Sequence, residues 1–465
     1  MLIAVEAIVN TSATSAAQPR VSPKTSAVPV GVEAPGRGSV KNFHHLRDID
    51  PYPRTRTGRG TPSVAKSPLC SDHADPRRQP VSSEVVTPPQ RSPKVVVWNW
   101  RAIAPSETFV RNQLRYLRTW DGHLVAALRQ RSWLTDDTDV ALYEQRERLR
   151  LRMFDRTGRS ARLRKYLKQT QPDLVHAHFA TSARTLMASA KAAGIPVLVT
   201  LHGWDVTAWP AVRLPLKRML ARWRLKCVLR DADRLIAVSS AIADAAVRWG
   251  ADPSKIVVHH IGVEIPLDQS FVENPRWDVI FVGRFVEKKG IDTLIEALHL
   301  LNAHSRVRAV LVGDGPLLET MKNRADLYGL ELDFLGAQPA NVVRRLLRES
   351  AVLAAPSRTA EDGDAEGLPT TVVEAAAAGL PVVATYHSGI PEAVVHGETG
   401  LLSAEGDERE LSRNLHRLVS SPEERRRMSL AAATRARQQF DVRNQTRELE
   451  RIYDDVARIV VCVNS

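Results

Sequence analysis

The chain has 465 residues, of which 43% are hydrophobic, and this excludes both a single small module and a fully disordered protein. The formal net charge is +13, which indicates an anionic partner: nucleic acid, a phosphate-bearing ligand or an anionic membrane surface. Cys70, Cys227 and Cys462 lie far apart without a CxxC pair, so neither a disulfide framework nor a zinc ribbon is predicted. Such cysteine usage is typical of a reducing, cytoplasmic compartment.

The amino-terminal segment, residues 1–93, contains nearly half of the 28 prolines and only two aromatic residues, Phe43 and Tyr52. This composition cannot bury enough apolar surface to offset its conformational entropy, so we expect a disordered tail. No run of about 18 apolar residues predicts a spanning helix. The start of the chain lacks a basic region and a cleavage site, so no secretory signal is expected either.

From Lys94 onward, short β-branched runs alternate with longer helical patterns, which predicts parallel sheets covered by helices on both faces. The first candidate strands are 95–98, 124–128, 174–176, 196–201, 234–238 and 256–259. After a proline-flanked break at 266–275 the pattern restarts, with strands 278–282, 308–312, 332–335, 352–355, 381–384 and 400–402. We therefore expect an α/β fold of two Rossmann-like, doubly wound domains facing across a cleft, 94–266 and 267–440, followed by a helix at 441–465.

The most informative segment follows strand 352–355. Its loop leads to Gly367 and Pro369, which open a helix. Amides near Leu368 and Thr370, at the start of this helix, are free to bind an anion such as a phosphate.

Glu366 and Glu374 flank that helix start. They are eight residues apart, close to two helical turns, so we expect them along one side of the same ligand. Carboxylates accept hydrogen bonds from sugar hydroxyls, which are abundant donors. The spacing alone is weak evidence, because among 52 acidic residues several such pairs arise by chance.

Basic residues follow the first strand of the second domain in the stretch Gly283-Arg284 to Lys289-Gly290. Two cations at a strand end can neutralise negative charge on a bound anion, and such preorganised electrostatics is often the largest catalytic contribution. We interpret this stretch as part of the same anion site.

Histidines end two strands of the first domain. Thr200-Leu-His202-Gly203-Trp-Asp205 ends one, and His202 there can donate a hydrogen bond and titrates near neutrality. His176 and His178 end another, without a third ligand at a spacing that would suit a metal. Ser106 is placed as the N-cap of the helix after the first strand.

These motifs resemble a known family. EGLPTTVVEAAAAGLPVVAT, from Glu366, followed by HSGIPEAV, is similar to the donor-site signature of GT-B glycosyltransferases, in particular the retaining family four. Residues 283–290 resemble its GR…KG motif, and residues 200–205 its His-Gly-x-Asp stretch. The Ser-Glu-Thr-Phe and HAHF segments resemble the colanic-acid type of exopolysaccharide glycosyltransferase. The resemblance extends from about residue 94 to the carboxyl terminus.

The resemblance implies a retaining transferase that moves a sugar from a nucleotide-diphosphate-sugar donor to a glycan or lipid-linked acceptor in surface polysaccharide synthesis. It implies that Glu366 holds hydroxyls of the transferred sugar, Glu374 the ribose, and Arg284 with Lys289 the diphosphate. The catalytic residues are His202, Arg284, Lys289 and Glu366; Gly283, Gly367, Leu368, Thr370 and Glu374 complete the donor site; and Ser106, His178 and Asp205 lie on the acceptor side.

No cofactor or metal is expected. Asp362-Gly-Asp364 mimics a metal-binding DxD motif, but that motif belongs to a different transferase fold. Two alternatives stay open: a sugar-nucleotide epimerase of the same fold, and a basic nucleic-acid-binding protein, although no RRM-like, C2H2 or KH pattern is present.

Residues 211–230 contain seven Lys or Arg and no acidic residue. Leu216, Met219, Leu220, Trp223 and Cys227 share one face of the predicted helix. This face either packs in the core or meets an anionic membrane surface. We expect a cytoplasmic protein, with peripheral attachment to the inner face of the membrane left open.

Overall fold

The structure, a computed structural model, describes residues 91–104, 107–130, 132, 134–267 and 271–464, with backbone alone for residues 459–464. Residues from Arg91 onward form one compact unit. The expected tail lies almost wholly outside the described residues, and so does Ser106. Among the described helices, none combines the length and the apolar character needed to cross a membrane.

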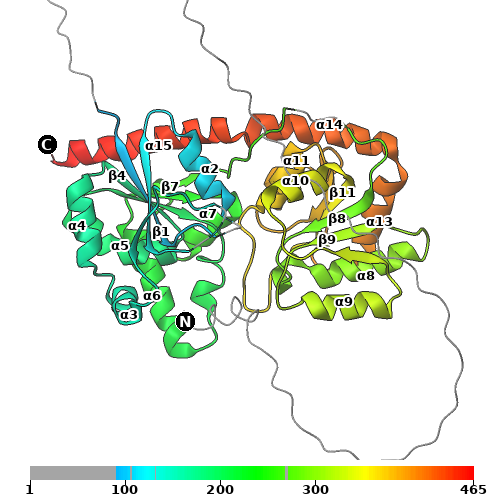
Figure 1. The fold of residues 1–465 in the computed structure, drawn as a ribbon, viewed down its shortest axis with the longest axis horizontal. Coiled ribbons are helices and arrows are strands. Elements are labelled where there is room, and N and C mark those ends of the chain that lie inside the picture. Colours follow the sequence, from blue (N-terminus) through cyan, green and yellow to red (C-terminus); the bar gives the residue numbers. More distant parts are fainter. Residues whose placement is uncertain (1–90, 105–106, 131, 133, 268–270, 465) are drawn as a thin grey trace, which may run out of the picture. The chain divides into compact units, whose positions relative to one another are not determined.

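The first sheet has seven parallel strands in the order β3-β2-β1-β4-β5-β6-β7 (Figure 1). The strands are β1 (Lys94–Arg101), β2 (Asp121–Leu128), β3 (Val140–Tyr143), β4 (Leu174–His178), β5 (Val197–Leu201), β6 (Arg234–Ala237) and β7 (Ile256–Val258). All six strands expected for this domain form. The edge strand β3 was missed because its four residues follow a polar loop and give too short an apolar signal.

Helices cover both faces of the first sheet. They are α2 (Thr108–Tyr116), α3 (Arg148–Thr157), α4 (Ala161–Thr170), α5 (Ala180–Ala192), α6 (Pro215–Asp231) and α7 (Ser240–Arg248). Trp98 of β1 donates its indole N–H to Ser182 of α5, 3.0 Å away. The next residue of β1, Val97, pairs in register with His176 of β4. The His176 side chain therefore lies on the face of the sheet opposite to that of Trp98.

The second sheet has six parallel strands in the order β10-β9-β8-β11-β12-β13. They are β8 (Trp277–Val282), β9 (Ala309–Val312), β10 (Leu332–Phe334), β11 (Ser350–Ala355), β12 (Val382–Thr385) and β13 (Gly400–Ser403). Alternate residues of β8 enter different cores, since Val279 and Phe281 belong to one apolar cluster while Ile280 belongs to another. The sheet is thus buried on both faces, as its continuous apolar strands predict.

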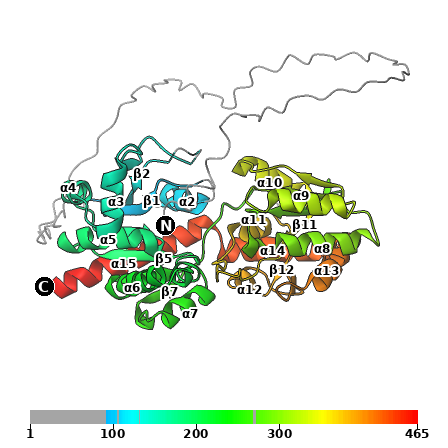
Figure 2. The same ribbon diagram turned by 90° about the horizontal axis from the view of Figure 1, so that it is seen from below.

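The helices of this second part are α8 (Ile291–Asn302), α9 (Leu318–Leu327), α10 (Ala340–Arg348), α11 (Thr370–Ala377), α12 (Ile390–Ala393), α13 (Glu408–Ser420) and α14 (Pro422–Gln439). Figure 2 shows α8 and α13 near one another, in agreement with their direct contact. Three short 3₁₀ turns complete the elements, at Trp209–Ala211, Pro253–Lys255 and Glu287–Lys289.

The last helix, α15 (Val442–Asn464), packs against α2 and β4 of the first sheet. Tyr453 lies 2.7 Å from Nδ1 of His176, and the Glu450 carboxylate accepts the amides of residues 118–120. The chain thus returns to the first domain after α14. The sequence indicated an amphipathic helix here but not the surface that it covers.

Candidate active site

Among the described residues, Lys289, Glu366 and His202 lie just after the carboxyl ends of parallel strands. Strand order reverses between β8 and β11 in the second sheet and between β1 and β4 in the first. Loops that leave the carboxyl ends on either side of such a reversal diverge, and ligands of doubly wound sheets bind there. Lys289 follows β8, while Glu366 follows β11.

Two ion pairs join the loops that follow β8 and β11. Lys289 Nζ lies 3.1 Å from Glu366 Oε1, and Lys288 Nζ lies 3.0 Å from Asp364 Oδ1. Burial raises the pKa of Glu366, but Lys289 and Lys288 outweigh it and hold that pKa below its ordinary value. The structure therefore brings together two residues that the sequence motifs placed 77 positions apart, and keeps the Glu366 carboxylate ionised.

The backbone around Glu366 is held by residues after β12. The amide of Glu366 donates to His387 Nε2 at 3.0 Å, and His387 Nδ1 lies 2.6 Å from Glu405. Ser388 donates its hydroxyl to the Glu366 carbonyl at 2.6 Å. Sequence reasoning did not assign these roles, although His387 and Ser388 open the HSGIPEAV stretch that contributes to the family resemblance.

Glu366 and Glu374 do not share a helix. Helix α11 begins at Thr370, so Glu366 lies in the preceding loop and only Glu374 is helical. Pro369 is the N-cap and extends the chain before α11, so the eight-residue spacing of the two carboxylates does not correspond to two turns of one helix. Leu368 is buried and Thr370 is half-buried at the helix start.

Glu374 carries a perturbed carboxyl group. Burial raises its pKa to about 7; Arg344 lowers this pKa and Glu264 raises it. Its side chain makes no hydrogen bond with another described residue. A half-buried carboxyl group of this kind, without a protein partner, is suited to a polar ligand.

Arg284 is exposed, and its guanidinium makes no ion pair with another described residue. Gly283, just before it, lies beside the Lys289 side chain, since a Cβ there would be 3.4 Å from Lys289 Cδ and Cε. A side chain at position 283 would thus crowd Lys289.

The loops after β5 and β11 meet through glycine. A Cβ on Gly367 would lie 2.2 Å from the carbonyl oxygen of His202, and one on Gly203 would lie 2.9 Å from the Gly367 nitrogen. Gly203 also has φ of +123°, which L side chains rarely adopt. Ser239 donates to the Gly367 carbonyl at 3.2 Å and adds a further link. The expected residues His202 and Gly367 are therefore direct neighbours.

The His202 ring packs in a cluster of aromatic rings. His178 Nδ1 lies 3.0 Å from His202 Nε2, and the rings of Phe109 and Phe179 lie 4.7 and 4.4 Å from that of His202. Burial lowers the pKa of His178 to about 3 and holds that of His202 well below its ordinary value. The expectation that His202 titrates near neutrality was therefore wrong, because burial penalises the charged ring.

His178 itself is fully buried, so it contacts His202 and not solvent. Its Nε2 makes no hydrogen bond with a described residue. His176 is engaged elsewhere, between Tyr453 and Thr200 at 2.7 Å each. The two histidines of the HAHF segment thus have different hydrogen-bond partners, although their rings lie only 4.5 Å apart.

Asp205 holds the loop that carries His202. Its Oδ1 accepts the amides of His202 and Gly203 at 3.1 and 3.0 Å, and its Oδ2 accepts that of Ala180 at 3.0 Å. The residue is 0% exposed, so both oxygens are engaged with the backbone. Asp205 therefore fixes the backbone that carries His202.

We expect Asp205→Ala to lower the free energy of unfolding by about 3 kcal/mol, because three backbone amides, two of them in buried hydrogen bonds, lose their acceptor. Urea unfolding followed by circular dichroism measures this. Asp205→Asn keeps one carbonyl oxygen, so its free energy of unfolding should lie between that of Asp205→Ala and that of the wild type. Unchanged stability of Asp205→Ala would contradict this structural role.

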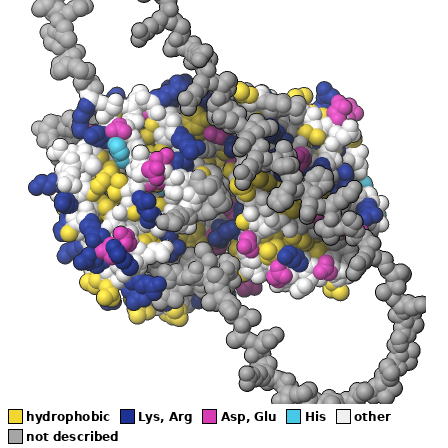
Figure 3. Space-filling model, viewed as in Figure 1, with side chains coloured by type: hydrophobic (Ala, Val, Ile, Leu, Met, Phe, Trp, Pro, Cys, Tyr) yellow, Lys and Arg dark blue, Asp and Glu magenta, His cyan; other side chains and the backbone are white. Residues whose placement is uncertain are grey.

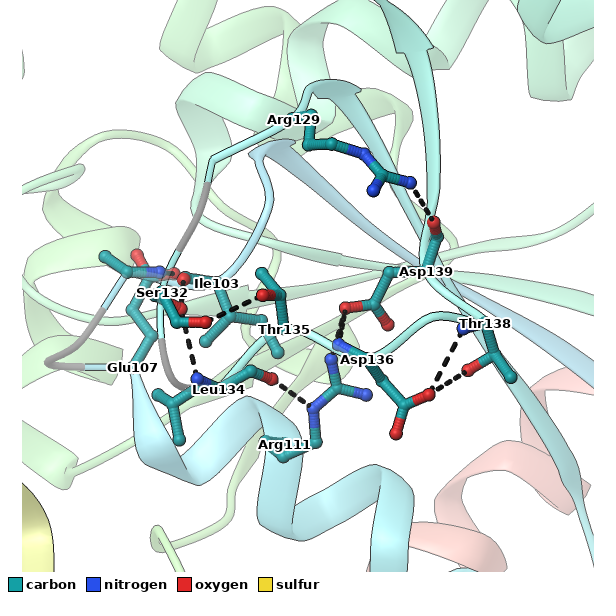
Figure 4. A network of polar contacts seen from close by, with 11 residues as sticks. Ile103, Glu107, Arg111, Arg129, Ser132, Leu134, Thr135, Asp136, Thr138 and Asp139 are labelled. Atoms are coloured by element: carbon teal, nitrogen blue, oxygen red, sulfur yellow. Dashed lines mark hydrogen bonds and ion pairs between the residues drawn. The ribbon is translucent and has the colours of Figure 1, made fainter.

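A second polar network fixes the loop after β2 (Figure 4). The buried Arg111 of α2 donates to the Leu134 carbonyl at 2.8 Å and pairs with Asp139, whose Oδ2 also accepts the amide of Asp136 at 2.8 Å. A small pocket lies between this loop and β2, bordered by Leu124, Ala126 and Arg129 among others. None of the expected donor residues borders it, so it is separate from the Lys289–Glu366 pair.

Comparison with known proteins gives two family matches that adjoin. Residues 106–266 match the family model described as Glycosyltransferase Family 4, and residues 267–435 match that of Glycosyl transferases group 1. The boundary at 266/267 is the proline-flanked break from which the sequence pattern restarts.

Individual relatives are more distant. A Salmonella typhimurium protein whose name associates it with colanic acid biosynthesis is 32% identical over 52% of this chain and 60% of its own length. The amylovoran biosynthesis glycosyltransferase AmsK of Erwinia amylovora is 30% identical over 56% of this chain and 66% of its own length. The matched part thus spans less than two thirds of either relative.

Among solved structures, Anabaena Alr3699/HepE in complex with UDP superposes with a TM-score of 0.63 at 20% identity. The alignment covers 78% of this chain and 100% of that one. At this identity the likeness concerns the fold, two Rossmann-like domains.

Proposed function

The chain belongs to the GT-B glycosyltransferases that join a family 4 domain to a group 1 domain, and on this premise we propose that it transfers a sugar from a nucleotide-diphosphate-sugar to an acceptor. The observation that supports this most directly is the Lys289–Glu366 pair at the β8/β11 reversal. It provides a cation for a diphosphate and an ionised carboxylate for sugar hydroxyls within one site.

We assign the donor to the second domain. Lys289 and the unpaired, exposed Arg284 would neutralise the diphosphate, with the amides near Leu368 and Thr370 at the start of α11 as further donors. Glu366 would accept hydrogen bonds from the transferred sugar and Glu374 from the ribose. The Anabaena structures that share the fold contain UDP or UDP-glucose, which agrees with a donor of this class.

The proposed chemistry is transfer with retention. The bond between the anomeric carbon and the diphosphate oxygen breaks, and a bond to the acceptor oxygen forms on the same face. The acceptor proton passes to the departing diphosphate oxygen. His202, neutral because it is buried, can donate a hydrogen bond near the reacting sugar without changing its charge.

We propose that no metal takes part. Of the two carboxylates in the Asp362-Gly-Asp364 stretch, Asp364 pairs with Lys288. Lys289 and Arg284 would already neutralise the diphosphate, so the charge that a divalent ion would supply is available from the protein.

The acceptor we propose is a lipid-linked glycan of a surface polysaccharide, by analogy with the relatives named for colanic acid and amylovoran biosynthesis. Such an acceptor would bring a cytoplasmic protein to the inner face of the membrane as a peripheral component. The epimerase and nucleic-acid-binding alternatives gain no support from the family matches.

The test is incubation of the purified protein with a panel of labelled nucleotide sugars and a lipid extract, followed by chromatography of the lipid and aqueous fractions. We expect label in the lipid fraction with one donor and release of its nucleoside diphosphate. Conversion of the nucleotide sugar to its epimer, with no labelled lipid, would overturn the proposal.

A further inference from the structure

Helices α3 and α6 of the first domain both carry exposed apolar side chains, and both pack on the same neighbouring helix, α5. Both α3 and α6 contact α5, which itself packs on β1, β4 and β5. Arg184 of α5 pairs with Asp155 of α3 at 2.6 Å, and Arg224 of α6 is close enough to affect the Arg184 pKa. Thus α3 and α6 lie on the same side of the first sheet. We call their outer side chains the α3/α6 surface.

Helix α6 has two apolar faces. Ala221, Leu225, Val228 and Leu229 are buried in the core. The face predicted from the sequence points outward instead, with Leu216, Met219 and Trp223 exposed by 73, 64 and 62%. The buried face packs in the core of the first domain. The exposed face has no apolar partner among the described residues.

Helix α3 repeats this pattern. Phe154 alone is buried, while Leu149 and Met153 are 77 and 60% exposed. With Leu214 and Leu220, the α3/α6 surface contains seven of the large exposed apolar side chains of the described chain. An apolar concentration of this kind marks an interaction site on a protein surface.

The same surface is strongly basic. Arg148, Arg152 and Arg156 of α3, with Lys217 and Lys226 of α6, are exposed and make no ion pair with another described residue. Nearby carboxylates are already neutralised: Glu147 by Arg150 and Arg162, Asp155 by Arg184, and Asp231 by Arg230. Figure 3 shows yellow and dark blue side chains together at the lower left, where Figure 1 places these helices.

We propose that the α3/α6 surface docks on an anionic lipid bilayer. Leu, Met and Trp side chains beside unpaired Arg and Lys fit the interface between headgroups and acyl chains, and each cation gains from the surface potential. A protein partner would need acidic and apolar groups in a matching arrangement, whereas a bilayer supplies both over its whole area. Docking of this kind would place the enzyme beside a lipid-linked acceptor. To this extent the inference rests on the proposed function.

The experiment is sedimentation of the full chain with vesicles, without donor or acceptor. We expect binding to vesicles of phosphatidylglycerol and phosphatidylcholine, little binding to phosphatidylcholine alone, and release as salt is raised. Arg148→Glu, Lys217→Glu and Lys226→Glu together should weaken binding by about tenfold or more. Leu216→Ser, Met219→Ser and Trp223→Ser together should also weaken it and leave a residual, salt-sensitive association.

The matched control carries the same change of charge elsewhere: Arg409→Glu, Arg413→Glu and Arg437→Glu, three exposed residues of α13 and α14 without ion pairs to described residues. It should bind vesicles like the wild type. Equal binding to neutral and anionic vesicles, or equal loss in the control, overturns the proposal, and so does a dimer in light scattering that the Ser variant abolishes. Because binding is measured without turnover, and turnover on a water-soluble acceptor analogue can be measured without vesicles, failure here is distinguishable from failure of the proposed activity.

Discussion

Replacement of Lys289 by Ala should lower kcat/KM by about two to three orders of magnitude, the loss typical of one preorganised group that stabilises developing charge. Two effects combine. The diphosphate loses a cation, and Glu366, which is 8% exposed, loses the ammonium 3.1 Å away that keeps its pKa low. With burial no longer opposed by Lys289, the pKa of Glu366 should rise.

The control for this prediction is Lys288→Ala, which removes the same charge one residue earlier. Its ammonium pairs with Asp364 at 3.0 Å, so we expect a much smaller loss of kcat/KM. Steady-state kinetics of folded variants, checked by circular dichroism, gives the comparison. Equal losses for the two lysines would mean that general positive charge, and not the Lys289–Glu366 pair, supports turnover.

Glu366 also makes stability depend on pH in a defined direction. Its pKa is depressed in the folded protein, so the Lys289 pairing stabilises the fold above the unfolded pKa of 4.5. That contribution is lost as pH falls through the folded pKa. In Lys289→Ala it should be absent at neutral pH as well.

The fold could be predicted from the sequence because its strands are buried on both faces. Continuous apolar runs such as Val352–Ala355 stand out wherever helices cover a sheet on either side, and the proline-flanked break separated the two sheets. Strand β3 is at an edge, and its residues Val140 and Ala141 are only half-buried, so its signal was weak.

The site was less predictable because its geometry depends on contacts between distant segments. The sequence indicated Glu366 and Lys289 separately, but not that they pair. Nor did it show that His202 is enclosed by Phe109 and Phe179, which lowers its pKa. The periodicity of apolar residues predicts which side chains share a face of a helix or strand. Whether that face is buried depends on neighbours far along the chain.

Helix α6 illustrates the same limit. The spacing of Leu216, Met219 and Trp223 is equally compatible with a core face and an exposed one. A second stripe, Ala221, Leu225 and Val228, occupies the core instead. Which of the two stripes is buried depends on where α5 and the sheet lie relative to α6.

Glu374→Gln should remove a pH dependence of donor binding that the wild type shows around neutrality. Burial raises the pKa of Glu374 to about 7, so its carboxyl group is protonated in most molecules at pH 6 and ionised in most at pH 8. Ribose hydroxyls donate more strongly to the ionised form. Donor affinity of the wild type should therefore increase from pH 6 to pH 8, as calorimetric titration with the donor nucleotide can measure.

The variant keeps an acceptor oxygen but no charge, so its donor affinity should be flat with pH and about tenfold below that of the wild type at pH 8. Stability gives an independent test with the opposite sign. A folded pKa above the unfolded value of 4.5 means that the folded protein holds its proton more tightly, so the free energy of unfolding falls as pH rises from about 4.5 to about 7. The free energy of unfolding of Glu374→Gln should not fall in this way. Urea unfolding should therefore show the stability of the variant rising relative to that of the wild type between pH 5 and pH 8. Parallel profiles for the two proteins in both measurements would mean that Glu374 neither titrates near neutrality nor contacts the donor.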